Sequence, residues 1–273
     1  MSRDYRSSIR TAAGVAESEP GEKPEHRVVI EDSPKRVRVF FGSRAIADTC
    51  RVKLMHETGH LPIYYFPRQD VEEDCLVASG HTSFCPVKGD ARYWSVRAGG
   101  RTAQNAAWNY PRPVAGCPDI SGLVAFYWNS MDAWYEEEEQ VFVHARDPYK
   151  RIDVLDSARH VEVVVDGAKI ADSHRPYILF ETGLPPRFYL PKLDVRMDLL
   201  EPTATRTACP YKGETAQYWT ATANGQRHTD LAWCYEYTTP EASRIAGRVC
   251  FYDERVDLYL DGELQERPVT QWS

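Results

Sequence analysis

The sequence predicts a mainly β protein built from two tandem antiparallel-sheet domains with few short helices. The first observation behind this prediction is an internal repeat, because residues 161–257 repeat residues 37–133 almost collinearly. The second is the alternation of short apolar strands with turn signals such as Gly-Gly, Asp-Gly and Asn-Gly. Helical periodicity is sparse. The repeat is far too long for a solenoid unit, so the two copies are interpreted as two fused domains.

Each copy is expected to open with a β-hairpin and to continue through further antiparallel strands. In the first copy, the predicted strands are 36–41, 44–48, 63–66, 92–97 and 122–127. In the second copy, they are 161–165, 168–172, 187–190, 217–223 and 247–252, followed by a short strand near 256–260. Short helical turns are expected near residues 102–109 and 228–234.

The sequence predicts two domains with a linker between them and a tail at each end. It comprises a flexible N-terminal tail (1–27), a first domain (28–135), a linker (136–151), a second domain (152–263) and a C-terminal tail (264–273). A chain of 273 residues is long enough for two domains that each bury a core.

Composition excludes several classes of protein. A net charge of −7 argues against nucleic acid as a partner, because phosphate binding needs a basic surface. No apolar run approaches the roughly 18–20 residues of a membrane span, and the N-terminal stretch lacks the apolar core of a signal peptide. Seven cysteines without a C-x-x-C pair favour free thiols. A cytoplasmic protein without a membrane partner is expected, and its oligomeric state is left open.

Residues 56–60 read His-Glu-Thr-Gly-His, a string that binds zinc when it lies on a helix. A glycine within it and a proline just after it make a poor helix interior. The second copy has Phe180 and Leu184 in place of the two histidines, yet it keeps Glu181 in place of Glu57. No metal site is therefore expected, and interest moves to the glutamates.

Two motifs that are present in both copies carry charged side chains. Glu57 and Glu181 stand in Glu-Thr-Gly, either as partly buried acid–base groups of raised pKa or as structural acceptors at a turn. Lys88 and Lys212 stand in Cys-Pro-x-Lys-Gly. A lysine held in this way could pair with the glutamate, bind an anionic group or act as a base or Schiff-base nucleophile. The residues leave open whether the lysine is catalytic or only pins the turn.

Aromatic residues form the third repeated set. They are Tyr65, Tyr93, Trp94, Trp108 and Tyr110, repeated as Tyr189, Tyr218, Trp219, Trp233 and Tyr235. Paired aromatics in a small β domain are usually core, but a Trp-walled pocket with one Glu and one Lys has the general form of a small-molecule site. Asp48 and Asp172, which end the opening hairpins, are interpreted as turn or cap residues or as a second pocket carboxylate.

In their order, these motifs resemble the DUF427 family in its tandem two-domain form, over roughly residues 28–262. The resemblance implies small, mainly β domains of the β-tent kind. Relatives with that architecture commonly hold zinc through paired C-x-x-C motifs, which this chain lacks, and some bind small molecules in a tryptophan cage. The second copy follows the family pattern more closely, since Tyr211 stands where the first copy has Val87.

The leading functional expectation is a metal-independent and cofactor-free enzyme that acts on a small organic molecule, as an isomerase, cyclase or lyase. Glu181 and Glu57 would act as acid or base, and Lys212 and Lys88 would stabilise developing negative charge. The alternatives are a non-catalytic small-molecule-binding module and a structural protein of two pseudo-symmetric domains.

Overall fold

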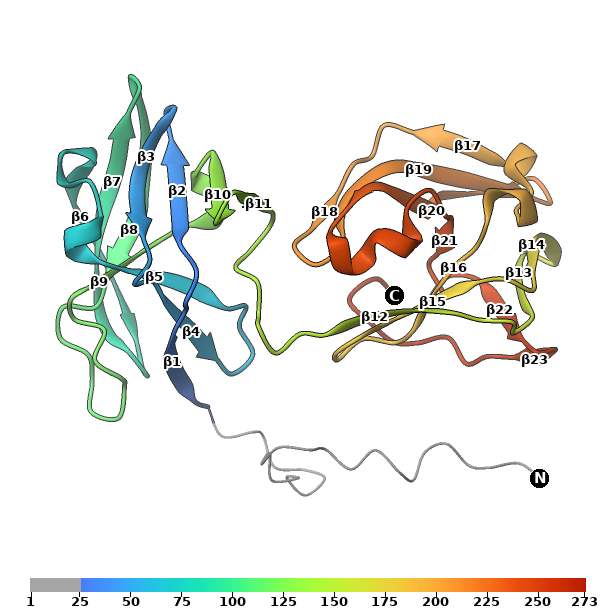
Figure 1. Ribbon diagram of the computed structural model, residues 1–273, viewed down its shortest axis with the longest axis horizontal. Helices are drawn as coiled ribbons and strands as arrows, with labels where there is room; N and C mark the ends of the chain where they lie inside the picture. Colours follow the sequence, from blue (N-terminus) through green and yellow to red (C-terminus); the bar gives the residue numbers. More distant parts are fainter. Residues whose placement is uncertain (1–25) are drawn as a thin grey trace.

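The computed structural model describes residues 26–273 as two β-rich lobes joined by an extended segment (Figure 1). The predicted N-terminal tail lies outside the described residues, apart from its last two. The described chain is mainly β, with antiparallel sheets and short 3₁₀ helices, as the sequence predicts. Among these residues, no helix is long and apolar enough to cross a membrane.

The first domain contains a large and a small antiparallel sheet. The large sheet consists, in spatial order, of β1 (Val28–Asp32), β4 (Lys53–Glu57), β5 (Ile63–Pro67), β9 (Leu123–Phe126), β8 (Arg101–Asn109), β7 (Gly89–Ala98) and β6 (Leu76–Cys85). The small sheet consists of β11 (Glu139–Val141), β10 (Ala133–Glu136), β2 (Val37–Phe41) and β3 (Arg44–Thr49). The 3₁₀ helices are η1 (Arg68–Asp70), η2 (Glu73–Cys75) and η3 (Trp128–Ser130).

The second domain repeats this plan, but its large sheet is divided. One part consists of β12 (Ile152–Asp156), β15 (Tyr177–Glu181) and β16 (Arg187–Tyr189). The other consists of β17 (Leu200–Thr203), β19 (Gly213–Ala223), β20 (Gln226–Thr238) and β21 (Cys250–Phe251), with β18 (Ala208–Cys209) also pairing with β19. A bridge between Leu190 and Val249 joins the two parts.

The small sheet of the second domain consists of β14 (Ala168–Ser173), β13 (Val161–Val165), β22 (Asp257–Leu260) and β23 (Glu263–Leu264). Three 3₁₀ helices complete this domain: η4 (Lys192–Asp194), η5 (Met197–Leu199) and η6 (Pro240–Ile245). The predicted opening hairpins, 36–48 and 161–172, are confirmed as β2–β3 and β13–β14.

The predicted helical turns at 102–109 and 228–234 are wrong. Both stretches are strands, because β8 pairs with β7 and β9, and β20 pairs with β19 and β21. Pairing on both sides overrides the weak local preference of an alanine-containing segment. The first six residues of the predicted linker (136–151) belong to the first domain, because Glu136 ends β10 and residues 139–141 form β11, which pairs with β10.

Each domain packs its interior as two clusters. The larger, mostly aliphatic cluster is formed by residues of both sheets and includes Val39 and Val163 of the small sheets. The smaller cluster, here called the aromatic core, is formed mainly by strands of the large sheet. Its aromatic members are Tyr65, Tyr93, Trp108 and Tyr110 in the first domain and Tyr189, Tyr218, Trp233 and Tyr235 in the second.

Candidate functional site

Each domain buries one glutamate–lysine ion pair beside its aromatic core. Lys88 Nζ donates a hydrogen bond to Glu57, and Lys212 Nζ donates one to Glu181. The side chains of Glu57 and Lys88 are 6% and 8% exposed, and those of Glu181 and Lys212 are 5% and 14% exposed. The structure thus brings together the residues of both predicted pairs, and the second pair is the more open to solvent at its lysine.

Local backbone geometry presents the two partners to one another. Glu181 is the last residue of β15 and precedes a turn in which Gly183 has a φ of 79°. Lys212 lies in the turn before β19, where its N–H donates to the Cys209 carbonyl at 3.3 Å and Gly213 has a φ of 101°. A positive φ favours glycine, so Gly183 and Gly213 allow the turns that orient the Glu181 and Lys212 side chains.

A second basic side chain reaches each glutamate from the segment that precedes the domain. His26 Nε2 lies 3.0 Å from Glu57 Oε1, and Lys150 Nζ lies 3.8 Å from Glu181 Oε1. The two positions are related by the same offset of 124 that relates the glutamates. Sequence reasoning missed them because the residue types differ, although the offset alone could have paired them.

The pKa values of Glu57 and Lys212 are both shifted in the direction that favours the charged form. Burial acts to raise the pKa of the Glu57 carboxyl, but the hydrogen bonds from Lys88 and His26, together with the nearby charges, outweigh it, and the pKa lies below its ordinary value. Burial acts to lower the pKa of Lys212, but its electrostatic and hydrogen-bond interactions with Cys209 and Glu181 outweigh burial, and the pKa is raised. The raised pKa considered for a catalytic carboxyl is therefore wrong for Glu57.

The structure separates the predicted aromatic set into two groups. Tyr93 belongs to the aromatic core, whereas its neighbour Trp94 packs against the larger cluster, and Trp219 is separated from Tyr218 in the same way. Adjacent residues of a strand point to opposite faces of the sheet, so such a pair cannot line one pocket. Within the aromatic core of the first domain, the ring centre of Tyr110 lies 5.9 Å from Lys88 Nζ.

Asp48 and Asp172 lie on the small sheets, outside the aromatic cores. Asp48 accepts two hydrogen bonds from Arg36, and Asp172 bonds His160 at 2.7 Å and Lys169 at 2.9 Å. Both aspartates lie within strands, β3 and β14, so the interpretation as turn or cap residues is wrong, and their contacts instead link the two strands of each opening hairpin.

Two histidine groups bear on metal binding. His56 lies on β4 and bonds Glu31 at 3.0 Å, while His60 follows the turn, so the pair is not presented on one helix face. His160, Asp172 and His174 have ligand atoms within 4.8 Å of one another and could hold a divalent cation. The equivalent positions of the first domain hold Arg36, Asp48 and Cys50, so such a metal site would not be shared by both repeats.

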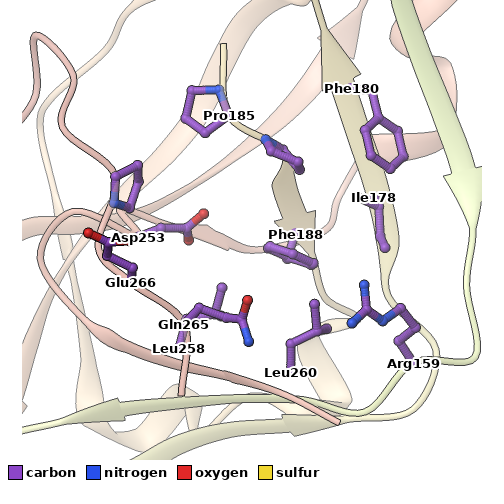
Figure 2. Close-up of a pocket in the computed structure, with 12 residues that line it drawn as sticks. Arg159, Ile178, Phe180, Pro185, Phe188, Asp253, Leu258, Leu260, Gln265 and Glu266 are labelled. Atoms are coloured by element: carbon purple, nitrogen blue, oxygen red, sulfur yellow. The ribbon is translucent and has the colours of Figure 1, made fainter. Parts of the chain in front are cut away.

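A hollow of about 340 Å³ opens in the second domain, at a place that sequence reasoning did not identify. Its walls, drawn in Figure 2, include Arg159, Ile178, Phe180, Phe188, Asp253 and Leu260. A second hollow of about 540 Å³ lies in the first domain, near Cys50, Arg51 and Lys53. No member of either glutamate–lysine pair lines these two hollows.

Comparison with protein-family profiles matches the domain of unknown function DUF427 twice, over residues 29–137 and 153–262. Each matched segment contains one complete glutamate–lysine pair. Comparison with curated proteins finds no match.

Proposed function

The chain belongs to the DUF427 family, and from this premise we propose that it is a metal-independent enzyme that acts on a small organic molecule by proton transfer. The observation that carries the proposal is the recurrence of one buried glutamate–lysine pair at the same place in both domains. Isolated charges are costly to bury, and a lysine and a glutamate in one site can serve opposite roles in proton chemistry.

The ionisation of Lys212 suits the role that we propose for it. The raised pKa of Lys212 keeps its ammonium positive, so that it can stabilise negative charge that develops on a substrate oxygen. Glu181 would take the proton from the neighbouring carbon or hydroxyl group. Lys150, 3.8 Å from Glu181, holds further positive charge at the centre when a substrate oxygen takes over the Lys212 contact.

We assign the working centre to the second domain. The Lys212 side chain is 14% exposed, against 8% for Lys88, so a substrate reaches it with less rearrangement. Tyr211 also packs its ring near His144 and accepts a hydrogen bond from the Asp147 N–H at 2.8 Å, which holds the linker beside the site. The first domain has Val87 at the Tyr211 position and lacks this contact.

The first domain fits the second candidate function, a non-catalytic binding module. The lowered pKa of Glu57 makes its carboxylate a weaker base, because a group that holds its proton less tightly also accepts one less readily. In this proposal the first domain binds or supports, and the second domain reacts. The proposal places the protein in the cytoplasm, where its seven free cysteines would remain reduced.

The test uses solvent exchange, since proton-transfer enzymes commonly exchange a substrate hydrogen with water. The full-length protein is incubated with a small-molecule cell extract in D₂O, and deuterium uptake is followed by mass spectrometry. We expect one metabolite pool to gain deuterium or to change mass, and E181Q and K212M to reduce the rate at least about 100-fold, the usual scale of general acid–base catalysis. The double variant E57Q/K88Q, which removes both charges of the first pair, is the matched control and should retain most of the rate.

A purely structural ion pair gives a different result. Removing one partner of a buried pair typically destabilises a protein by about 3–5 kcal/mol, whereas removing both charges costs less. If the pair is only structural, the double variant E181Q/K212Q should regain both stability and activity. If the pair is catalytic, as we propose, the double variant should regain stability and remain inactive. If no metabolite exchanges, or if the double variant is as active as the parent, the enzymatic proposal is wrong.

A further inference from the structure

The hollow of the second domain is mostly apolar. Ile178 and Phe180 of β15, Phe188 of β16, and Leu258 and Leu260 of β22 contribute side chains to it. Figure 2 shows these side chains grouped around one space, with Asp253 and Arg159 on opposite sides of it. A volume of about 340 Å³ lies within the range of small-molecule pockets.

Asp253 is the unusual member of this wall, because its carboxyl group is buried without a firm partner. Its side chain is 8% exposed, and Arg187 Nη1 lies 3.5 Å away, beyond a normal hydrogen bond. The Arg187 guanidinium instead donates two hydrogen bonds to Glu254, which also accepts one from Thr270. One buried arginine therefore faces two carboxylates, and Glu254 has the better geometry.

The first domain has no equivalent of this arrangement. Trp128 stands at the position of Asp253 and stacks on Trp134, with ring centres 4.3 Å apart. Tyr64, at the position of Phe188, lies against Trp134 and bonds Glu136. Large rings thus occupy the place where the second domain has a hollow.

The predicted C-terminal tail completes the hollow. Gln265, Glu266 and Pro268 form part of its wall, and the Gln265 N–H donates to the Leu258 carbonyl at 2.8 Å. Further along, the Trp272 ring lies 5.6 Å from the Arg187 guanidinium. The end of the chain is thus packed onto the domain, where it covers the buried Arg187–Glu254 pair.

We propose that this hollow binds a small molecule that has an apolar body and one protonated amine, with the amine donating hydrogen bonds to Asp253. An ammonium group would supply the close partner that Asp253 lacks, and the apolar body would cover the aliphatic and aromatic wall. The site is separate from the Glu181–Lys212 centre and does not depend on the enzymatic proposal.

The charges around the hollow exclude an anionic ligand. Arg159, on the opposite wall, already donates to Asp261 at 2.7 Å, and Arg187 is engaged by Glu254. A carboxylate ligand would meet Asp253 and Glu266 without a free cation. Like charges in a partly desolvated site repel strongly, so the hollow selects against acids.

Binding should also depend on pH. Burial raises the pKa of Asp253 to about 7, and Arg187 only partly opposes this effect, while nearby Glu254 adds to it. The other charged wall residues are Arg159 and Glu266. Amines with a pKa near that of lysine stay protonated from pH 6 to pH 8, whereas Asp253 ionises over this interval. The affinity for an amine should therefore increase about 10-fold between pH 6 and pH 8.

The experiment titrates the full-length protein with phenethylamine, tryptamine and cyclohexylamine, and with 3-phenylpropionate as the anionic counterpart of similar size. Isothermal titration calorimetry and NMR shift mapping report affinity and location. We expect at least one amine to bind saturably, 3-phenylpropionate not to bind, and D253N to weaken the amine at least about 10-fold, or about 1.4 kcal/mol. D253N keeps the shape of the side chain and leaves the Arg187–Glu254 pair in place.

Two further variants control for location and charge. E266Q removes a carboxylate from the more exposed rim and should change the affinity less than about 3-fold. L260W, checked for folding by calorimetry, should block binding by filling the hollow while Asp253 remains. The inference is overturned if no amine saturates at millimolar concentration, if 3-phenylpropionate binds equally well, or if D253N binds the amine like the parent.

Discussion

Asp253 and Glu57 are both buried carboxyl groups, yet the pKa of Asp253 is raised and the pKa of Glu57 is lowered. Glu57 has Lys88 in direct contact, so its pKa falls below the ordinary value although it is buried. Asp253 shares Arg187 with Glu254 and has only the 3.5 Å contact, so burial prevails and its pKa rises to about 7. At the scale of single residues, the distance to the nearest cation decides whether a buried carboxyl remains ionised at neutral pH.

The raised pKa of Asp253 predicts a loss of stability with rising pH. An ordinary aspartate has a pKa near ~3.9 in the unfolded chain, so between about pH 4 and pH 7 the unfolded chain has released the Asp253 proton that the folded protein still holds. Rising pH through this window therefore favours unfolding, by at most about 4 kcal/mol once pH 7 is passed. D253N should accordingly be more stable than the parent at pH 8 and close to it at pH 4. Urea unfolding at both values checks this, and an equal difference at both would contradict it.

The turn that carries the lysine is the element on which the candidate centre depends. In both domains it follows a Cys-Pro step and ends at a glycine with a φ of 101°, Gly89 or Gly213. The surroundings of the two glycines differ. A Cβ atom at Gly213 would lie 2.1 Å from the Tyr237 carbonyl oxygen, whereas one at Gly89 would lie 3.0 Å from the Arg112 carbonyl oxygen.

This difference predicts unequal costs for the same substitution. G89A should destabilise its domain by about 1–3 kcal/mol, the usual cost of an unfavourable backbone conformation. G213A should cost more, because a backbone carbonyl of β20 must also move. Differential scanning calorimetry of the two variants measures the comparison. Equal shifts in the melting temperature of the two domains would show that the contact at Tyr237 relaxes without cost.

At the same scale, strand alternation and strand pairing explain which sequence expectations were met. The hairpins 36–48 and 161–172 were predictable, because their turn signals act between neighbouring residues. The strands β8 and β20 were not, since their conformation is imposed by partners far along the chain. The separation of Trp94 from Tyr93 follows from the two-residue period of a strand, and it was derivable from the sequence once that stretch was assigned as β.

Contacts of the connecting segment couple the two domains in the whole molecule. Tyr149 Oη donates to Glu31 of the first domain at 2.6 Å, and Arg146 lies 3.5 Å from Glu241 of the second. Tyr211 accepts the Asp147 N–H at 2.8 Å. The segment is thus held by side chains of both domains.

Removing the Tyr211 hydroxyl should loosen this segment without unfolding either domain. Y211F deletes one hydrogen bond, which typically contributes about 0.5–1.5 kcal/mol. We expect faster hydrogen–deuterium exchange at the Asp147 amide, read from peptides that cover residues 144–150, with little change in the exchange of β19 or β20. Y149F serves as the matched control, because it breaks the contact with Glu31 and leaves the Asp147 amide bonded. Unchanged exchange in Y211F would show that other contacts hold the segment.

The sequence by itself determined the duplication, the mainly β architecture and the identity of the glutamate and lysine residues that meet in each domain. These features follow from composition, turn chemistry and the comparison of two copies within one chain. Only the tertiary structure decided which aromatic residues surround the charges, that His26 and Lys150 join the glutamates, and that Asp253 borders a hollow. The physical reason is that each of these three features depends on packing between segments that are distant in the sequence. The neighbours of a residue in such packing are specified neither by its local sequence nor by the corresponding residue of the other repeat.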